Sequence, residues 1–378
     1  MQCYTSLCNL GALNIMCVYR DFIKPLLFQL DPEKSHELAY KFIARGAPIL
    51  AALSSRFIYP NDDLQVSIFG TTLSNPIGLA AGFDKNGNLV HAYKYLGFGH
   101  GEVGSISALP HEGNPKPRLY RLPADEALIN WMGLNNEGAI KIAEKLATSD
   151  FSVPIGINIV KTNRAELYGD SAVEDLLFTF RAIRHLPILY VAINVSCVNT
   201  PEGILQETDV LSSLLEKIED ENPAKLPILL KLSEDGSDEL IQKMLAIGKR
   251  FNIAGYICGN TTRQRPPLKT DARIVASIKQ GGLSGPPIKQ LILPLCQKVY
   301  ELKEKDQIII STGGVSTGQD AYEYIRAGSS AVQLYTSLVY EGPSVVRKIC
   351  EQFSALLKRD DLTLAQAIGA DCATKAER

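Results

Sequence analysis

Short apolar segments alternate with longer amphipathic segments from about residue 75 to the end of the chain. The apolar segments predict buried parallel strands, because helices cover both faces of such strands and leave them no polar face. Strands are expected at 76–80, 101–104, 154–158, 188–194, 227–231, 253–258, 307–311 and 331–334. Helices are expected near 87–96, 137–147, 171–184, 208–220, 236–250, 288–304, 317–327 and 343–358.

Strands and helices that alternate in this way predict an α/β fold, a (β/α)8 TIM barrel. A doubly wound open sheet is the alternative, since it is built from the same units. The first predicted strand is not followed by the GxGxxG motif that is typical of dinucleotide-binding open sheets. The pattern therefore favours a closed barrel, which we place at residues 61–378.

Residues 1–60 have a different pattern, which predicts a separate N-terminal helical extension. Asp31, Pro32 and Glu33 are typical of a helix start. Leu38 and Phe42 follow at helical spacing, with charged residues between them. These features predict a pair of short amphipathic helices. Two roles are compatible with such a pair, a helical cap packed on the barrel and an anchor on a membrane surface.

The composition is that of a globular protein, with 46% hydrophobic and 21% charged residues among 378. The net charge is −2 and the basic residues are scattered, which argues against a nucleic-acid partner. The eight cysteines include no CxxC pair, so neither a disulfide framework nor a metal site is expected. The chain lacks both a spanning apolar segment and a signal or transit pattern, so we expect an untargeted mature protein.

Polar residues gather just after the predicted strands, where a barrel of this type carries its chemistry. The run from Asn194 to Thr200, which contains Cys197 and Asn199, directly follows a buried strand. Other strand ends supply Lys85, Ser105, Asn158, Lys231, Asn260 and Thr261. Several lysines and amides at one barrel mouth predict an anionic ligand with many hydrogen-bonding groups.

A phosphate site is predicted at the last two strands. Gly313-Gly314 follows the seventh strand and Tyr335-Thr336 follows the eighth. The loops after these strands are the usual phosphate site of the fold, and paired glycines let backbone N–H groups approach an anion. The small residues at 80–82 leave room for a flat ring. Both FMN and a phosphosugar fit this pattern, and the number of amides favours FMN.

Six ordered motifs occur along the chain: GLAAGFDK at 78–85, EGNPKPR at 112–118, GGLSG at 281–285, GQDA at 318–321, IRAG at 325–328 and VQLYT at 332–336. Together they resemble the motifs of class 2 dihydroorotate dehydrogenases, the membrane-associated, quinone-reducing type. The resemblance runs from about Asp31 to the end of the chain. Its first part, Asp31 to Glu33 with His36, is similar to the class 2 extension that forms the quinone tunnel, which favours the membrane role of residues 1–60.

The resemblance implies an FMN enzyme that oxidises (S)-dihydroorotate to orotate in pyrimidine biosynthesis and passes electrons to a membrane quinone. FMN would be held by Ala81, Gly82, Ser105, Asn158, Lys231, Gly285, Gly314, Tyr335 and Thr336. Dihydroorotate would be held by Lys85, Asn130, Asn194, Asn199, Asn260 and Thr261. His36, Arg121 and Tyr335 would lie near the quinone path. A peripheral membrane location is also implied, on the cytoplasmic face of a bacterial cell membrane or on the mitochondrial inner membrane of a eukaryote.

The reaction needs a base and the flavin on opposite faces of the substrate ring, because a proton leaves C5 while hydride leaves C6. Class 2 members usually have serine at the base position, whereas this chain has Cys197, the residue used by class 1. A thiol with a pKa of about 8.5 loses its proton far more readily than a hydroxyl, so Cys197 is chemically competent as the base. A buried, inert cysteine is the alternative.

Four further positions depart from the family pattern. Trp131 stands where the family has arginine, Val160 and Val198 replace a glycine and a proline, and Gly259 replaces a threonine. The lost arginine and threonine would weaken flavin or loop contacts, and Val160 would crowd a tight turn that needs glycine. Together these changes indicate a divergent member of the family.

Three functions stay open from the sequence. They are a quinone-dependent dehydrogenase, a related FMN barrel that uses Cys197 with a soluble oxidant, and a non-catalytic protein that binds flavin or quinone. The second leaves residues 1–60 without a role. The third is motivated by the four departures.

Overall fold

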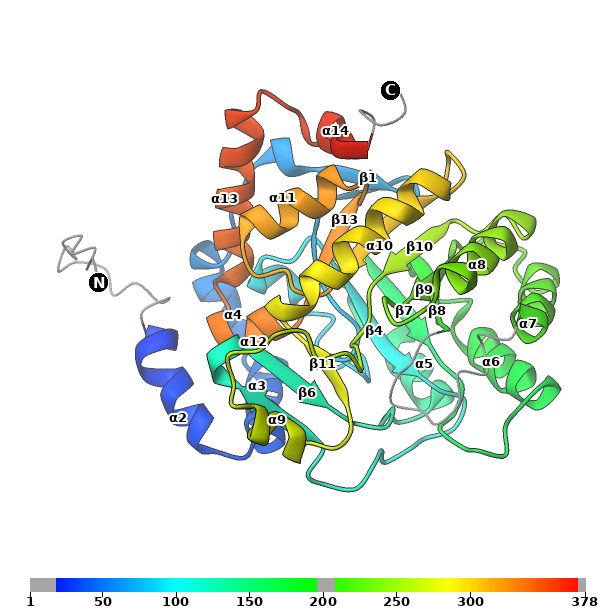
Figure 1. Cartoon of the computed structure of the whole chain (residues 1–378), viewed down its shortest axis with the longest axis horizontal. Helices are drawn as coiled ribbons and strands as arrows, with labels where there is room; N and C mark the ends of the chain where they lie inside the picture. Colours follow the sequence, from blue (N-terminus) through cyan, green and yellow to red (C-terminus); the bar gives the residue numbers. More distant parts are fainter. Residues whose placement is uncertain (1–17, 196–207, 373–378) are drawn as a thin grey trace.

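A closed barrel of parallel strands forms the centre of the molecule (Figure 1). The structure, a computed structural model, describes residues 18–195 and 208–372. The barrel strands in this part of the chain are β3 (Ile77–Leu79), β4 (His100–Ile106), β7 (Ile155–Ile159), β8 (Tyr190–Asn194), β9 (Ile228–Leu232), β10 (Gly255–Cys258), β12 (Ile308–Thr312) and β13 (Ala331–Leu334). They lie around the barrel in chain order, and β13 pairs with β3 to close it. The predicted (β/α)8 barrel is confirmed, and the open sheet is wrong.

Amphipathic helices cover the outside of the barrel, as predicted. They are α5 (Ala139–Ala147), α6 (Asp170–Ile183), α7 (Thr208–Asp220), α8 (Asp238–Arg250), α10 (Lys289–Leu302), α11 (Gly318–Arg326) and α13 (Val345–Arg359). The local sequence determines where two of these helices begin. Ser237 accepts a hydrogen bond from the N–H of Leu240 at the start of α8, and Thr317 and Asp320 form a capping box on α11. Short helices lie in the loops: η3 (Asp62–Leu64), η5 (Pro123–Asp125), α9 (Ala272–Ser277), η7 (Pro286–Ile288), α12 (Thr336–Glu341) and α14 (Leu364–Ala367).

The helix predicted near 87–96 is wrong. This segment is a loop that ends in the short 3-10 helix η4 (Tyr93–Leu96). The carboxylate of Asp84 accepts hydrogen bonds from the backbone N–H groups of Asn88 and Leu89. These bonds hold the backbone in a loop in competition with helical hydrogen bonds.

A two-stranded hairpin closes the amino end of the barrel. It consists of β1 (Val66–Ile68) and β2 (Thr71–Leu73), and it packs Ile68 and Leu73 against apolar residues that point into the barrel. The barrel interior is therefore filled at this end, as expected for a fold whose sites lie at the carboxyl ends of the strands.

A small antiparallel sheet lies at the opposite end from the hairpin (Figure 1). Its strands are β5 (Leu119–Leu122), β6 (Ala127–Asn130) and β11 (Gly282–Ser284), and β6 is the central one. Asn130 pairs with Leu119 on one side and with Gly282 on the other. The strand periodicity did not predict this sheet, whose strands are short and come from loops far apart in the chain.

The N-terminal extension consists of consecutive short helices beside this sheet. They are η1 (Tyr19–Ile23), α2 (Lys24–Gln29), α3 (Pro32–Arg45), α4 (Ala47–Leu53) and η2 (Ser54–Arg56). The side chain of Asp31 caps α3 by accepting hydrogen bonds from the N–H groups of Glu33 and Lys34, so the predicted helix start is confirmed. Within 18–195 and 208–372, every helix is too short or too polar to cross a lipid bilayer.

Candidate active site

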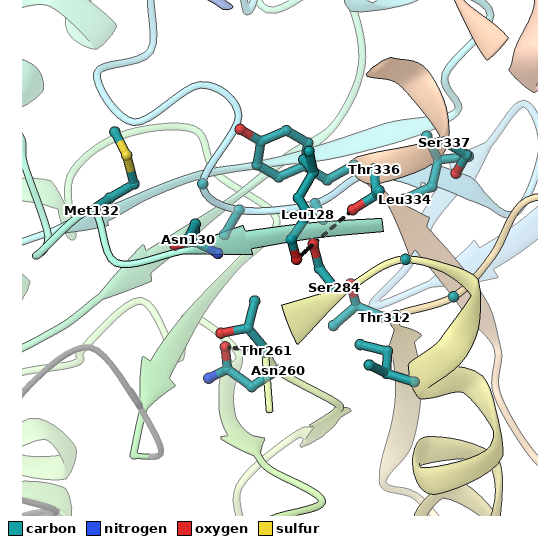
Figure 2. A pocket seen from close by; sticks show the side chains of 18 of the residues that line it. Leu128, Asn130, Met132, Asn260, Thr261, Ser284, Thr312, Leu334, Thr336 and Ser337 are labelled. Atoms are coloured by element: carbon teal, nitrogen blue, oxygen red, sulfur yellow. Dashed lines mark hydrogen bonds between the residues drawn. The ribbon is translucent and has the colours of Figure 1, made fainter. Parts of the chain in front are cut away.

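The carboxyl ends of the barrel strands surround a polar cavity, and most of the predicted binding residues line it. From the predicted cofactor set these are Ala81, Gly82, Ser105, Lys231, Gly285, Gly314, Tyr335 and Thr336. From the predicted substrate set they are Lys85, Asn130, Asn194, Asn260 and Thr261. In Figure 2, Asn130, Asn260 and Thr261 lie toward one side of the cavity, whereas Ser284, Thr312 and Thr336 lie toward the other.

Two predicted residues, Cys197 and Asn199, lie outside the described residues, and so does Val198. The described chain leads up to them through Asn194 and Val195 at the end of β8. Asn158 is fully buried and does not line the cavity directly. It lies one shell behind the wall, where its amide oxygen accepts a hydrogen bond from the hydroxyl of Ser105.

The side of the cavity nearest β12 and β13 has the features of a phosphate cradle. The hydroxyls of Ser284 and Thr336 lie 2.9 Å apart (Figure 2), and both line the cavity. Gly285 has a φ of +105°, and a Cβ there would lie 2.8 Å from the carbonyl oxygen of Glu126. Gly314 has a φ of +72°, and a Cβ there would lie 2.7 Å from the Cβ of Lys289. Both positions therefore require glycine, which keeps the backbone close to the cavity.

A chain of hydrogen-bonded amides crosses the cavity floor. The side-chain amide of Asn260 donates to the oxygen of Asn194 at 3.2 Å, and the amide of Asn194 donates to the hydroxyl of Ser105 at 3.3 Å. Ser105 then donates to Asn158, whose own amide donates to Glu102 at 2.9 Å. Residues predicted to hold the substrate are thus joined to residues predicted to hold the cofactor.

Glu102 ends this chain and was not predicted. Its carboxylate is completely buried and also accepts hydrogen bonds from Tyr190 at 2.8 Å and Gln333 at 3.0 Å. The ammonium of Lys231 lies 3.3 Å away. Burial alone would raise the pKa of Glu102, but Lys231 and the three neutral donors hold it below its usual value. A glutamate inside the predicted apolar strand at 101–104 was the available signal for this network.

Lys85 has an environment suited to binding an anion. It lines the cavity, and its ammonium donates to the carbonyl oxygen of Gly82 at 2.7 Å. Burial and the nearby guanidinium of Arg118 lower the pKa of Lys85 to about 8. Arg118 is itself paired with Glu33 of α3 at 2.7 Å. Lys85 is therefore a partly buried cation whose charge an anionic ligand would satisfy.

A second cavity, of about 450 Å³, lies between the N-terminal helices and the barrel. Apolar residues from α2, α3, α4 and α12 form most of its lining, among them Leu27, Phe28, Leu38, Phe42, Leu50, Leu338 and Val339. His36, Leu119, Leu128 and Tyr335 line this cavity and the polar cavity as well. The two cavities are therefore separated by a wall about one side chain thick.

Aromatic rings make up part of this shared wall. The rings of His36 and Phe83 have centroids 5.1 Å apart, and those of Phe83 and Tyr335 are 5.3 Å apart, both edge to face. Burial and the charge of Lys85 lower the pKa of His36 to about 3. His36 is consequently a neutral imidazole at physiological pH, consistent with its place in an apolar wall.

Arg121 lines the apolar cavity only. Its guanidinium donates to the carbonyl oxygens of Leu27 and Leu30 at the end of α2, and it stacks 4.5 Å from the ring centroid of Phe28. Cations bind well at a helix C-terminus, where carbonyl groups lack partners. Arg121 thus holds the N-terminal helices against β5, and among the described residues that line this cavity it is the only Asp, Glu, Lys or Arg.

The structure gives a local account of two departures from the family pattern. Gly259 has a φ of +110°, and a Cβ there would lie 2.0 Å from the carbonyl oxygen of Thr312. A threonine does not fit this backbone, so glycine is required here. Val160 is buried and its φ is not positive, so the backbone at this turn does not need glycine. The backbone N–H of Trp131 donates a hydrogen bond to the backbone carbonyl oxygen of Arg118.

Comparison with known proteins agrees with this site. The family model for dihydroorotate dehydrogenase matches residues 63–357. The chain is 40% identical to a Natronomonas pharaonis protein named dihydroorotate dehydrogenase (quinone), over 92% of this chain and 98% of the relative. A Gloeobacter violaceus protein of the same name is 39% identical, over 94% and 99%.

Solved structures give the same result. The crystal structure of DHODH from Eimeria tenella in complex with ferulenol superposes with a TM-score of 0.80 at 29% identity, covering 92% of this chain and 98% of that one. Its ligand-free form superposes with a TM-score of 0.79 at 31% identity. The chain therefore belongs to the dihydroorotate dehydrogenase family, in its class 2.

Proposed function

We propose that this protein oxidises (S)-dihydroorotate to orotate in pyrimidine biosynthesis, with FMN as the bound cofactor and a quinone as the final electron acceptor. The pair of cavities that share His36, Leu119, Leu128 and Tyr335 carries this proposal. One cavity is polar and contains a buried cation, and the other is apolar. Such a pair suits an anionic substrate on one side and an apolar electron acceptor on the other.

The residues around the polar cavity fit FMN. Gly285, Gly314, Thr336 and the neighbouring Ser284 would hold its phosphate, because glycine brings backbone donors close and the hydroxyls add further donors. Ala81, Gly82 and Tyr335 would flank the ring, with Ser105 and Lys231 at its polar edge. Asn158 would act from behind the wall, through its hydrogen bond with Ser105. When bound, FMN supplies the acceptor for the C6 hydride and the electrons for the quinone.

Dihydroorotate would bind between Lys85 and the amides of the polar cavity. The ammonium of Lys85 pairs with the substrate carboxylate, and Asn130, Asn194, Asn260 and Thr261 hold the ring in one orientation. We assign Asn199 to the same set. Cys197 takes the proton from C5 as its thiolate, and the described end of β8 brings the chain to the cavity just before it.

The quinone would enter the apolar cavity from the N-terminal helices. His36 and Tyr335 belong to both linings, so a quinone there lies next to the polar cavity. Arg121 is placed to donate a hydrogen bond to a quinone carbonyl oxygen, because its guanidinium lines the same space. A soluble oxidant would have no need of an apolar space of this size.

We infer that residues 1–60 form a quinone-binding and membrane-associated domain and that residues 61–378 form the catalytic barrel. Large apolar side chains of the extension are exposed, at Phe22, Ile23, Leu26, Leu30, Leu38, Phe42 and Ile49. So many exposed apolar side chains on one short helical segment favour a peripheral membrane surface. The location would be the cytoplasmic face of the cell membrane in a bacterium, or the mitochondrial inner membrane in a eukaryote.

Flavin absorbance tests the proposal. The purified protein should be yellow, and released flavin should co-elute with FMN on chromatography. Anaerobic dihydroorotate should bleach the colour, and a short-chain ubiquinone or menaquinone should restore it. A colourless protein would contradict the cofactor assignment. Recovery with fumarate or NAD in place of a quinone would select a soluble oxidant.

A further inference from the structure

Glu234 is a mostly buried acid beside the substrate side of the polar cavity, and the proposed mechanism does not use it. It lies two residues beyond the end of β9. One carboxylate oxygen accepts a hydrogen bond from the backbone N–H of Asn260 at 3.2 Å. The other oxygen, Oε1, is buried and has no hydrogen-bond partner within residues 18–195 and 208–372. A buried carboxylate oxygen without a partner is costly, so a structural role alone explains this glutamate poorly.

The backbone held by Glu234 presents two side chains to the cavity. Asn260 and Thr261 both line it, and the N–H of Thr261 donates to the side-chain oxygen of Asn260 at 2.9 Å. The amide of Asn260 then donates to Asn194 from β8. A shift of the backbone at Asn260 would therefore move the side-chain amides of Asn260 and Asn194 together.

The next residue holds the following part of the same loop. The carboxylate of Asp235 accepts hydrogen bonds from the hydroxyl of Thr262 and from the backbone N–H of Arg263. Asp235 is exposed and both of its carboxylate oxygens accept hydrogen bonds, whereas Glu234 is mostly buried and its Oε1 accepts none within the described residues. The two neighbouring acids thus fix consecutive parts of the loop, and only Glu234 has a spare buried oxygen that can hold a proton.

Two titratable groups interact electrostatically with Glu234. Asp235 lies beside it on the same loop, and Tyr324 of α11 lies near enough to interact with it electrostatically. Burial, followed by the charge of Asp235, raises the pKa of Glu234 to about 7. The backbone N–H groups of Glu234 itself and of Asn260, together with the hydroxyl of Ser233, act in the other direction by favouring the ionised form. Glu234 therefore changes charge within the physiological pH range.

We propose that Glu234 is a positioning residue for dihydroorotate and orotate, whose ionised carboxylate holds Asn260 and Asn194 in their binding arrangement and whose protonation loosens it. This inference rests on the assignment of Asn260 and Asn194 as substrate amides in the proposed function. The physical basis is that a carboxylate accepts a backbone N–H about twice as strongly as a neutral acid does. Substrate affinity should therefore increase as Glu234 loses its proton.

The test is the pH dependence of orotate binding to the FMN-loaded enzyme. We expect the orotate dissociation constant of wild type to fall about five-fold between pH 5.5 and 7.5. A change of this size corresponds to the net contribution of one hydrogen bond to the free energy of binding. E234Q, which resembles the protonated acid in shape and charge, should keep the weak low-pH constant across this range. In steady state the KM for dihydroorotate should follow the same pattern, while kcat of E234Q stays within about two-fold of wild type at each pH.

Glu239→Gln is the matched control, because Glu239 lies five residues further along the chain, in the first turn of α8. Its side chain is 77% exposed and forms an ion pair with Lys243 at 2.7 Å. Its profile should match that of wild type. A second variant, Glu234→Ala, removes the acceptor and should weaken orotate binding at every pH. If E234Q retains the wild-type pH dependence, or if Glu234→Ala binds orotate normally, the positioning role is wrong. Wild-type protein that binds no orotate would instead contradict the proposed function.

Discussion

The ammonium of Lys231 lies 3.3 Å from the carboxylate of Glu102, and both side chains are almost completely buried. Lys231 lines the polar cavity, whereas Glu102 lies behind it and also binds Asn158, Tyr190 and Gln333. The cavity wall therefore carries a cation whose counter-charge is hidden inside the barrel. A buried pair of this kind costs far more to break than to replace as a whole.

Substitution of one partner should destabilise the protein more than substitution of both. Glu102→Gln or Lys231→Met should each lower the unfolding free energy by about 3 kcal/mol, because each leaves a buried charge without its partner. The double variant should lose less than the sum of the two. Urea unfolding of the three variants and wild type measures this coupling. Additive losses would mean that the two groups act independently.

Gly285→Ala should reduce FMN binding at least ten-fold. The new Cβ would lie 2.8 Å from the carbonyl oxygen of Glu126 and 3.1 Å from the side chain of Thr336, so the backbone must move away from the cradle. Gly70→Ala is the matched control, because Gly70 also has a positive φ but has nothing within 4 Å of the new Cβ. The control should lose about 1 kcal/mol of stability from backbone strain and bind FMN normally. Fluorescence titration of apoprotein with FMN gives both affinities.

Replacement of Phe22 and Leu26 by serine should weaken binding to lipid vesicles. Both side chains are 65% exposed and lie one turn apart. Removal of two apolar groups of this size should reduce the partition coefficient by at least ten-fold. Co-sedimentation with vesicles measures the change, and activity with a water-soluble quinone analogue should be unaffected. A double variant with unchanged sedimentation would place the membrane contact elsewhere.

His36 should make stability depend on pH. Its pKa is about 3 in the folded protein, below its usual value of 6.5, so the unfolded chain binds a proton that the native protein does not. Its contribution is therefore fully present above about pH 6.5 and is lost as the pH falls toward 3. Wild type should lose on the order of 3 kcal/mol more than His36→Gln between pH 7 and pH 4. Guanidinium unfolding at the two pH values makes the comparison, and equal losses would contradict a buried neutral imidazole.

Cys197→Ala should abolish turnover while FMN remains bound. A positioned base contributes about 10² to 10⁴ in rate, so the loss should fall in that range. Cys197→Ser should recover part of the activity with its optimum at higher pH, because a hydroxyl loses its proton less readily than a thiol. Stopped-flow reduction by dihydroorotate under anaerobic conditions isolates this step. Normal reduction in the alanine variant would make Cys197 an inert cysteine.

The barrel could be predicted from the sequence because its strands are buried on both faces and its helices on one. Each predicted strand has a counterpart within a few residues in the structure. The prediction of a helix near 87–96 was wrong because the carboxylate of Asp84 accepts hydrogen bonds from the backbone of that segment. The sheet of β5, β6 and β11 was missed because strands of three or four residues give too short a periodic signal.

The candidate site could be predicted in part. Strand-end residues such as Lys85, Asn194 and Asn260 were found because a barrel brings them to one mouth. Glu102 and Glu234 were missed because their roles depend on partners that are distant in sequence. Gly259 could be seen as a departure, but only its backbone angle explains why threonine does not fit.

The hairpin of β1 and β2 has a practical consequence for handling the protein. It packs on the barrel at the end opposite the small sheet (Figure 1), and neither cavity is lined by any of its residues. Its turn at Phe69 and Gly70 has positive φ angles and open space around Gly70. A fluorophore or an immobilisation tag at this turn would leave substrate, quinone and lipid access unobstructed. The protein could then be tethered to an electrode or a sensor chip in one defined orientation.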